Sequence, residues 1–152
     1  MLLTIDVGNT QTVIGLYGDG DQAHSLIDHW RVATNHERTS DEHALLVQEF
    51  LSFAGHDWKS TISGVAISSG VPMVTYELRR MCERYLRIEP VVLGAGVKTG
   101  MPVLYDNPRE VGADRIANAV GAYDLYGGPT IVVDFGTATT FDVISGNGEY
   151  LG

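Results

Sequence analysis

The chain has 152 residues, of which 44% are hydrophobic and 19% charged, a balance typical of a globular protein and not of a disordered one. Its 10 Lys and Arg residues and 19 Asp and Glu residues give a formal net charge of −9, which argues against nucleic acid or an anionic membrane as a partner. A phosphate group would therefore have to be held by backbone N–H groups and bound cations.

The cysteine content and the first residues bear on location. Cys82 is the single cysteine, so no internal disulfide can form, and a reducing compartment is the simple interpretation. Residues 1–5 lack a basic leader or a long apolar stretch, so neither a secretory signal nor a transmembrane helix is expected there. The predicted location is cytoplasmic.

The chain is predicted to begin with antiparallel strands. Apolar, β-like runs cover residues 2–5 and 12–17 with a glycine turn between them, and a third strand is expected at 26–32. A helix then follows, with Ser40 as its N-cap, acidic residues in its first turn and Gly55 at its end. Its inward stripe is expected to consist of Leu46, Phe50 and Phe53.

The middle of the chain has a β-α-β-α pattern. Residues 62–68 form a β-rich run, Pro72 suits the first turn of a helix, and residues 91–93 predict another strand. A further helix is expected after Asn107, because Asn107 and Glu110 resemble a capping box with a proline at the first helical position. The residues expected to face inward are Val74, Leu78, Met81 and Tyr85 in the earlier helix, and Ile116, Val120 and Tyr123 in the later one.

A second strand-turn-strand unit follows the break at Gly127-Gly128-Pro129. It comprises apolar runs at 130–134 and 140–144, so the pattern of the chain's start recurs after about one domain length. We therefore predict one domain over residues 1–126 and the start of a second, incomplete domain over residues 127–152.

The two turns, Asp6-Val7-Gly8-Asn9-Thr10 and Asp134-Phe135-Gly136-Thr137-Ala138-Thr139, share an aspartate, a glycine and threonines. Glycine lets the backbone turn tightly next to a ligand, hydroxyls such as those of Thr10 and Thr12 can donate to phosphate oxygens, and the aspartate can face a cation. A single turn of this kind mostly just connects two strands. Its recurrence predicts a pair of turns that grips a nucleoside triphosphate.

A polar segment precedes the last predicted helix. The run Val111-Gly112-Ala113-Asp114-Arg115 sets a carboxylate and a guanidinium beside a glycine. By itself such an Asp-Arg step is more often a solvated surface pair. A functional role is favoured by its polar neighbours Tyr105, Asp106, Asn107 and Arg109.

Taken in order, these motifs resemble those of type III pantothenate kinase, a family of the actin, sugar kinase and Hsp70 ATPase superfamily. The matching runs are Asp6-Val7-Gly8-Asn9-Thr10, Lys98-Thr99-Gly100-Met101-Pro102, Tyr105-Asp106-Asn107-Pro108-Arg109-Glu110-Val111-Gly112-Ala113-Asp114-Arg115 and Asp134-Phe135-Gly136-Thr137. The resemblance implies an α/β fold. A ribonuclease H-like first domain, with a mixed sheet and flanking helices, would be followed by the first hairpin of a truncated second domain.

The resemblance also implies an activity, the ATP-dependent phosphorylation of pantothenate to 4'-phosphopantothenate at the start of coenzyme A synthesis, carried out by a homodimer. Asp114 would be the general base, and Asp134 would bind a monovalent cation, potassium or ammonium. Pantothenate would contact Tyr105, Gly112, Ala113, Asp114 and Arg115. ATP would contact Asp6, Val7, Gly8, Asn9, Thr10, Gln11, Thr12, Val13 and Thr137. A threonine that the family supplies to the substrate site from further along does not occur in the chain.

Electrostatics favours a divalent cation as well. Asp6, Asp114 and Asp134 would repel ATP, because two unit charges about 4 Å apart interact by about 4 kcal/mol at an effective dielectric of 20. We therefore expect Mg²⁺ on the phosphates near Asp6. The substrate carboxylate could meet Arg115, Arg109 or Tyr105.

Other motifs fit the sequence less well. Lys98-Thr99 is similar to the end of a P-loop, but Val97 stands where that motif needs glycine. The glycines at 94, 96 and 100 miss a dinucleotide fingerprint by one residue, and the five histidines show no paired spacing that suits zinc. Two alternatives to an active kinase stay open: a non-catalytic nucleotide-binding or regulatory protein of the same fold, and an inactive fragment of the kinase.

Overall fold

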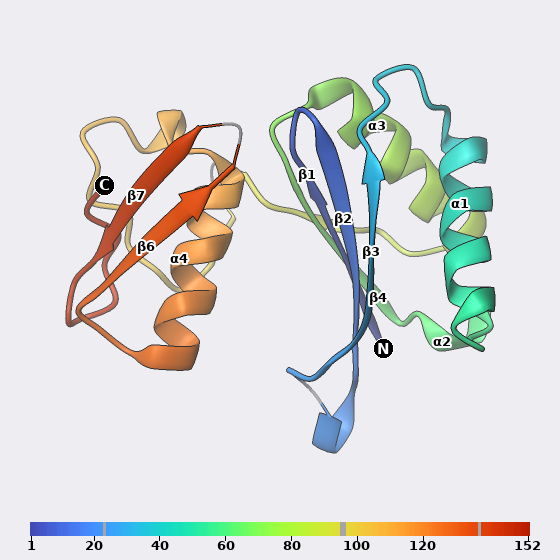
Figure 1. The fold of residues 1–152 in the computed structure, drawn as a ribbon, viewed down its shortest axis with the longest axis horizontal. Helices are drawn as coiled ribbons and strands as arrows, with labels where there is room; N and C mark the ends of the chain where they lie inside the picture. The colour runs from blue at the N-terminus through green and yellow to red at the C-terminus, as the bar shows by residue number, and fades with distance from the viewer. Residues whose placement is uncertain (23, 95–96, 137) are drawn as a thin grey trace. The chain divides into compact units, whose positions relative to one another are not determined.

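The structure is a computed structural model that describes residues 1–22, 24–94, 97–136 and 138–152 (Figure 1). The chain divides into two compact units, Met1–Val92 and Leu93–Gly152, and each has a hydrophobic core of its own. The division between these compact units thus falls after Val92, earlier than the predicted boundary after residue 126. The predicted boundary marks where the strand-turn-strand unit recurs, which is a different criterion, and it stays a prediction.

The first unit is built on a mixed five-stranded sheet with the strand order β3-β2-β1-β4-β5. The strands β1, β2 and β3 form an antiparallel meander, whereas β4 pairs parallel with β1, and β5 pairs parallel with β4. Their bounds are Leu2–Val7 for β1, Gln11–Tyr17 for β2, Leu26–Ala33 for β3, Gly64–Ser69 for β4 and Val91–Val92 for β5. The predicted strands and the predicted mixed sheet are therefore confirmed.

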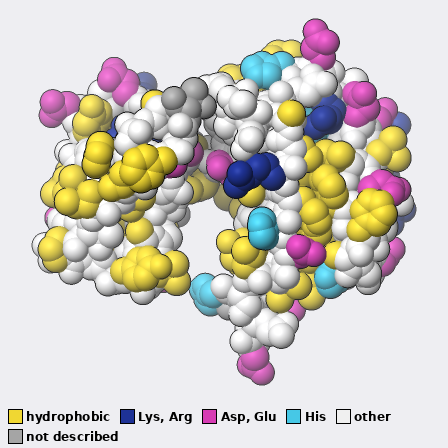
Figure 2. Space-filling view, viewed as in Figure 1, with side chains coloured by type: hydrophobic (Ala, Val, Ile, Leu, Met, Phe, Trp, Pro, Cys, Tyr) yellow, Lys and Arg dark blue, Asp and Glu magenta, His cyan; other side chains and the backbone are white. Residues whose placement is uncertain are grey.

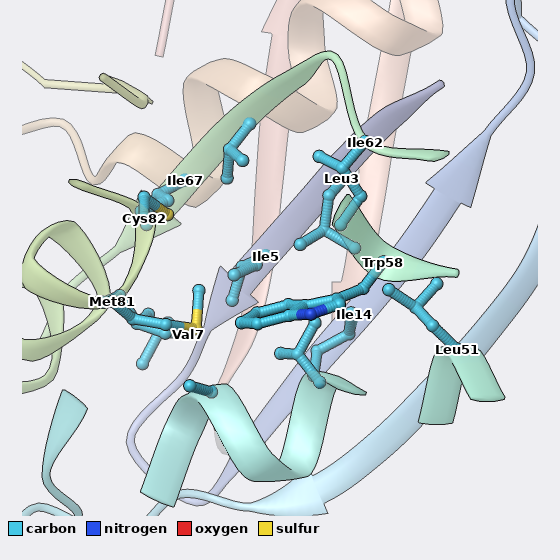
Figure 3. Close-up of a cluster of buried hydrophobic side chains, with 14 of the residues drawn as sticks. Leu3, Ile5, Val7, Ile14, Leu51, Trp58, Ile62, Ile67, Met81 and Cys82 are labelled. Carbon is cyan, nitrogen blue, oxygen red and sulfur yellow. The ribbon is translucent and has the colours of Figure 1, made fainter. Parts of the chain in front are cut away.

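Helices cover one face of this sheet (Figure 1). They are α1 (Ser40–Phe53), the short α2 (Trp58–Thr61) and α3 (Pro72–Met81), which continues as a π-helical turn η2 (Cys82–Leu86). Alternate residues of β1 point into the core beneath them, where Leu3, Ile5 and Trp58 are almost fully buried (Figure 3). Each buried aliphatic side chain contributes about 1.5–3 kcal/mol. None of the described helices is long and apolar enough to cross a bilayer.

The start of α1 differs from the sequence prediction, and so does part of its inward face, although Phe50 packs against the first core as expected. Thr39, one residue before Ser40, is the N-cap, and Glu42 completes a capping box with it. The buried positions follow from that start: Ser40, His43, Ala44, Val47 and Leu51. Phe53 was expected to face inward but is 82% exposed, because two residues beyond Leu51 rotate it about 200° around the helix.

The second unit joins a helix to a hairpin. It contains a short 3₁₀ turn η3 (Pro108–Glu110), the helix α4 (Ala113–Tyr126), and the antiparallel strands β6 (Thr130–Phe135) and β7 (Thr139–Ile144). One face of the hairpin packs with Ala119 of α4 and with Tyr150, which are both fully buried. The other face exposes apolar side chains that gather over the hairpin in Figure 2: Ile131, Val133, Phe135, Phe141 and Val143.

The predicted capping box at Asn107 is wrong. The Asn107 amide donates to the Glu110 carboxylate at 2.6 Å within η3, and its side chain caps no backbone N–H. The helix α4 begins only at Ala113, with Gly112 as its N-cap. The side chains of Ile116, Val120 and Tyr123 pack against the second core as expected.

His43 makes the stability of the first unit depend on pH. Its side chain is 4% exposed, and its Nε2 has no hydrogen-bond partner within the described ranges. Burial, reinforced by Arg38 and opposed by Glu77 and Glu42, lowers the pKa of His43 from 6.5 to about 4. The native state therefore binds this proton less readily than the unfolded chain does.

We predict that the free energy of unfolding falls as the pH drops from 6.5 toward 4, because the unfolded chain takes up the His43 proton more readily than the native state. The contribution of neutral His43 is fully present above pH 6.5, and its loss amounts to up to about 3 kcal/mol. Urea unfolding followed by tryptophan fluorescence measures this, since Trp30 and Trp58 both lie in the first unit. The variant His43→Leu should lose less stability than the parent over this pH range. Parallel stability curves for parent and variant would contradict the assignment.

Candidate functional site

The first glycine turn lies between the end of β1 and the start of β2. Gly8 N–H donates to the Gln11 carbonyl at 3.0 Å, which closes the turn over Gly8, Asn9 and Thr10. A Cβ on Gly8 would lie 3.1 Å from that carbonyl oxygen, so closure this tight favours glycine. The three turn residues are exposed, and the backbone N–H groups of Asn9 and Thr10 bond to no other described residue. Open N–H groups at an exposed turn can receive an anion.

The residues that flank this turn differ in exposure. Asp6 and Gln11 are exposed, Val13 is half-buried, and Val7 and Thr12 point into the core of the first unit. ATP could therefore reach Val7 and Thr12 only through their backbone. The assignment of residues 6–13 to ATP stays a prediction.

Thr12 does not have the free hydroxyl that the sequence suggested. Thr34 Oγ1 donates to the Gly8 carbonyl at 2.7 Å, which uses the single proton of that hydroxyl. In the 2.8 Å contact between the two threonine hydroxyls, Thr12 must therefore be the donor. Its proton is used inside the protein here, so donation to a phosphate would require this bond to be exchanged, and the assignment of Thr12 to ATP stays a prediction.

The second turn connects β6 and β7. Gly136 N–H donates to the Ala138 carbonyl at 3.1 Å, and Asp134 is half-buried on β6 opposite Thr140. Thr137, the predicted ATP contact in this turn, lies outside the described residues. Within the described ranges, no three His, Cys, Asp or Glu side chains group to hold a metal. A cation at Asp134 or Asp6 would need other ligands, such as phosphate oxygens, carbonyls or water.

The predicted base lies in the first turn of α4. Asp114 is exposed, and its carboxylate accepts a hydrogen bond from Arg115 N–H at 2.9 Å. An acidic side chain at this end of the helix is favoured by the helix dipole. A Cβ on Gly112 would collide with the Asp114 carboxylate oxygen, so glycine at the N-cap leaves room for this orientation. Ala113 between them is half-buried.

Arg115 turns toward a carboxylate that the sequence analysis missed. Its Nε donates to Asp142 Oδ1 at 2.7 Å, its Nη2 lies 2.6 Å from the same oxygen, and Tyr150 Oη donates to it at 2.6 Å. Asp142 is fully buried. An acidic residue at an inward position of an otherwise apolar strand is the signal that could have identified it.

The electrostatics of this trio keep both donors protonated. Burial acts to lower the pKa of Arg115, but the hydrogen bond and charge of Asp142 outweigh it and raise the pKa. Burial, then the hydrogen bond and charge of Asp142, raise the pKa of Tyr150 well above its usual value. The guanidinium and the phenol therefore both donate to Asp142 at neutral pH. Arg115 is largely occupied within the second unit.

A cavity of about 480 Å³ lies in the second unit. Its wall is mostly apolar, with Val97, Met101, Val103, Val111 and Ile116, and its polar part comes from Thr99, Asn107 and Arg109. This size and lining suit a small ligand with an apolar body and one polar end. Arg109 forms no ion pair with any other residue that the structure describes. Tyr105, which does not line this cavity, is 41% exposed.

Comparison with solved structures identifies proteins with a similar fold. A protein from Cytophaga hutchinsonii described as a sugar kinase matches with a TM-score of 0.55 and 18% identity, covering 99% of this chain and 49% of its own. A Ppx/GppA phosphatase from Aquifex aeolicus matches with a TM-score of 0.51 and 13% identity, covering 95% and 48%. The chain thus has the α/β fold with a mixed sheet found in sugar kinases and Ppx/GppA proteins, as expected for an actin-like ATPase fold.

Sequence comparison identifies the family. The model for type III pantothenate kinase matches residues 2–152. Proteins named type III pantothenate kinase from Myxococcus xanthus and Moorella thermoacetica are 55% and 54% identical over 152 residues, all of this chain. The chain belongs to the type III pantothenate kinase family. It spans 57% and 58% of the length of these two relatives.

We predict that Asp142→Ala destabilises the second unit by about 1–3 kcal/mol, because it leaves the buried Tyr150 hydroxyl and the half-buried Arg115 guanidinium without their common partner. Hydrogen exchange of the β6 and β7 amides measures this. The matched control Asp124→Ala removes an exposed carboxylate from the same unit and should change its stability by less than about 0.5 kcal/mol. Equal protection in both variants would show that the contacts of Asp142 with Arg115 and Tyr150 are not what holds α4 to β7.

Proposed function

We propose that the protein is a pantothenate kinase, which transfers the γ-phosphoryl group of ATP to the primary hydroxyl of pantothenate in the first step of coenzyme A synthesis. The observation that carries this proposal is the family match over residues 2–152. Support also comes from the open N–H groups of the first glycine turn and from the exposed carboxylate of Asp114 at the start of α4. Backbone donors and a carboxylate both suit phosphoryl transfer, because this reaction depends on positioning the substrates and stabilising the charge on the transferred phosphoryl group more than on covalent catalysis.

Asp114 is the proposed base. Its carboxylate orients the pantothenate hydroxyl toward the γ-phosphate and accepts its proton as the bond to phosphorus forms. The N–H groups of Asn9 and Thr10 receive phosphate oxygens. Because Arg115 is largely engaged by Asp142, Arg109 on the cavity wall is the better partner for the substrate carboxylate, while the apolar wall receives the dimethyl part.

Cations and a second subunit complete the proposal. Mg²⁺ bound to the phosphates near Asp6, together with potassium or ammonium at Asp134, would offset the repulsion between these carboxylates and ATP. We also propose a homodimer in the cytoplasm. The single buried Cys82 is consistent with a reducing compartment.

Two forms of the chain test the proposal. One is the 152-residue chain, and the other, here called the extended chain, adds the part of the Myxococcus xanthus relative that lies beyond its matched segment. Each is mixed with ATP, Mg²⁺, potassium and pantothenate, and phosphopantothenate is sought by mass. Product from the extended chain is expected. Nucleotide binding by it without product would instead favour a non-catalytic protein of the same fold.

We predict that Asp114→Asn in the extended chain lowers kcat by roughly a hundredfold and leaves the KM for ATP nearly unchanged, because the amide can still accept a hydrogen bond but cannot take the proton. Steady-state kinetics with both substrates varied measures this. The control Asp124→Asn alters an exposed aspartate of the same helix and should keep the parent kcat. Near-parent turnover by Asp114→Asn would remove Asp114 from this role.

A further inference from the structure

Thr34 holds two of the three carbonyl groups of the first glycine turn, those of Gly8 and Thr10. It directly follows β3, on the far side of β2 from β1. Its Oγ1 donates to the Gly8 carbonyl at 2.7 Å, and its backbone N–H donates to the Thr10 carbonyl at 3.0 Å. One residue, distant in sequence, thus restrains the first and the last residue of the turn.

These two bonds decide which backbone groups of the turn stay open. A carbonyl oxygen carries negative partial charge, so one that faces a phosphate would repel it. In this turn the carbonyls of Gly8 and Thr10 are both satisfied from the β3 side, while the N–H groups of Asn9 and Thr10 have no partner among the residues described. The arrangement leaves two donors available and keeps two of the turn's three carbonyl acceptors occupied, while the Asn9 carbonyl accepts no bond from the residues described.

The turn has little else to keep it in this conformation. Its three residues are exposed, so packing contributes little, and within it only the bond from Gly8 N–H to the Gln11 carbonyl closes the backbone. Exposed segments with few buried contacts open readily. The Thr12 hydroxyl donates to Thr34 and thereby helps to orient the Thr34 hydroxyl toward Gly8.

We propose that Thr34 is a positioning residue for nucleotide binding, which holds the Gly8–Thr10 turn in the conformation that receives the phosphates of ATP. This inference rests on the proposed kinase function. Thr34 acts through the backbone of the turn and need not touch the nucleotide.

The test compares three variants of the extended chain. Thr34→Val keeps the shape and the backbone N–H but removes the hydroxyl, Thr34→Ser keeps the hydroxyl, and Thr4→Val is the matched control. The Thr4 hydroxyl donates to the Gly15 carbonyl at 3.3 Å in the same pair of strands, away from the turn. For Thr34→Val we expect the KM for ATP to rise about tenfold with the KM for pantothenate unchanged. Thr34→Ser and Thr4→Val should stay within about twofold of the parent.

Two further measurements separate this inference from the kinase function. Calorimetry with ATP and Mg²⁺ in the absence of pantothenate reports nucleotide binding alone, and hydrogen exchange reports whether the Gly8 amide loses protection in Thr34→Val. If the parent binds ATP but makes no product, weaker binding by Thr34→Val still supports the role of Thr34 while the kinase function fails. Equal changes in both KM values, or loss of ATP binding in Thr4→Val as well, would mean that the hydroxyl serves general stability and would overturn the proposal. A parent that binds no ATP would overturn both.

Discussion

The central place of β1 is the constraint on which the first unit depends. This strand pairs antiparallel with β2 and parallel with β4, so its carboxyl end is held on both sides. Its inward residues, Leu3, Ile5 and Val7, are buried in the core under the helices. A one-residue slip would move that apolar set to the other face. The register that buries the core therefore also places Asp6 and the Gly8 turn at the edge where parallel strands end, which is where ligands bind in open α/β sheets.

In the second unit, the buried carboxylate of Asp142 is the constraint on which the packing depends. A carboxylate without water must be paired, and Asp142 is paired by Arg115 and Tyr150, which come from α4 and from the segment after β7. The same contacts therefore connect the helix start that carries Asp114 with the hairpin that carries Asp134. Arg115 cannot be regarded simply as a substrate-binding residue, because its guanidinium also supports the fold of this unit.

Local patterns account for what the sequence predicted correctly. The alternation in β1 and β2, the glycine at each turn, and Pro72 at the start of α3 are signals that lie within a few residues of the feature they specify. The errors arose where two local signals compete. Ser40 and Thr39 are both good N-caps, and only Thr39 has Glu42 at the third helical position. Asn107 and Glu110 have capping-box spacing, yet they close a 3₁₀ turn before α4.

The contacts that were missed join residues distant in sequence. Nothing near Thr34 indicates that its hydroxyl meets Gly8, and nothing near Asp142 indicates that its partner is Arg115, since both pairings appear only when the strands are aligned. Both contacts share one physical logic. In each case a donor from a distant segment satisfies an oxygen: the Thr34 hydroxyl donates to the Gly8 carbonyl, and the Arg115 guanidinium donates to the buried Asp142 carboxylate. The carboxylate of Asp114, by contrast, stays exposed at the start of α4, as its proposed role as a base requires.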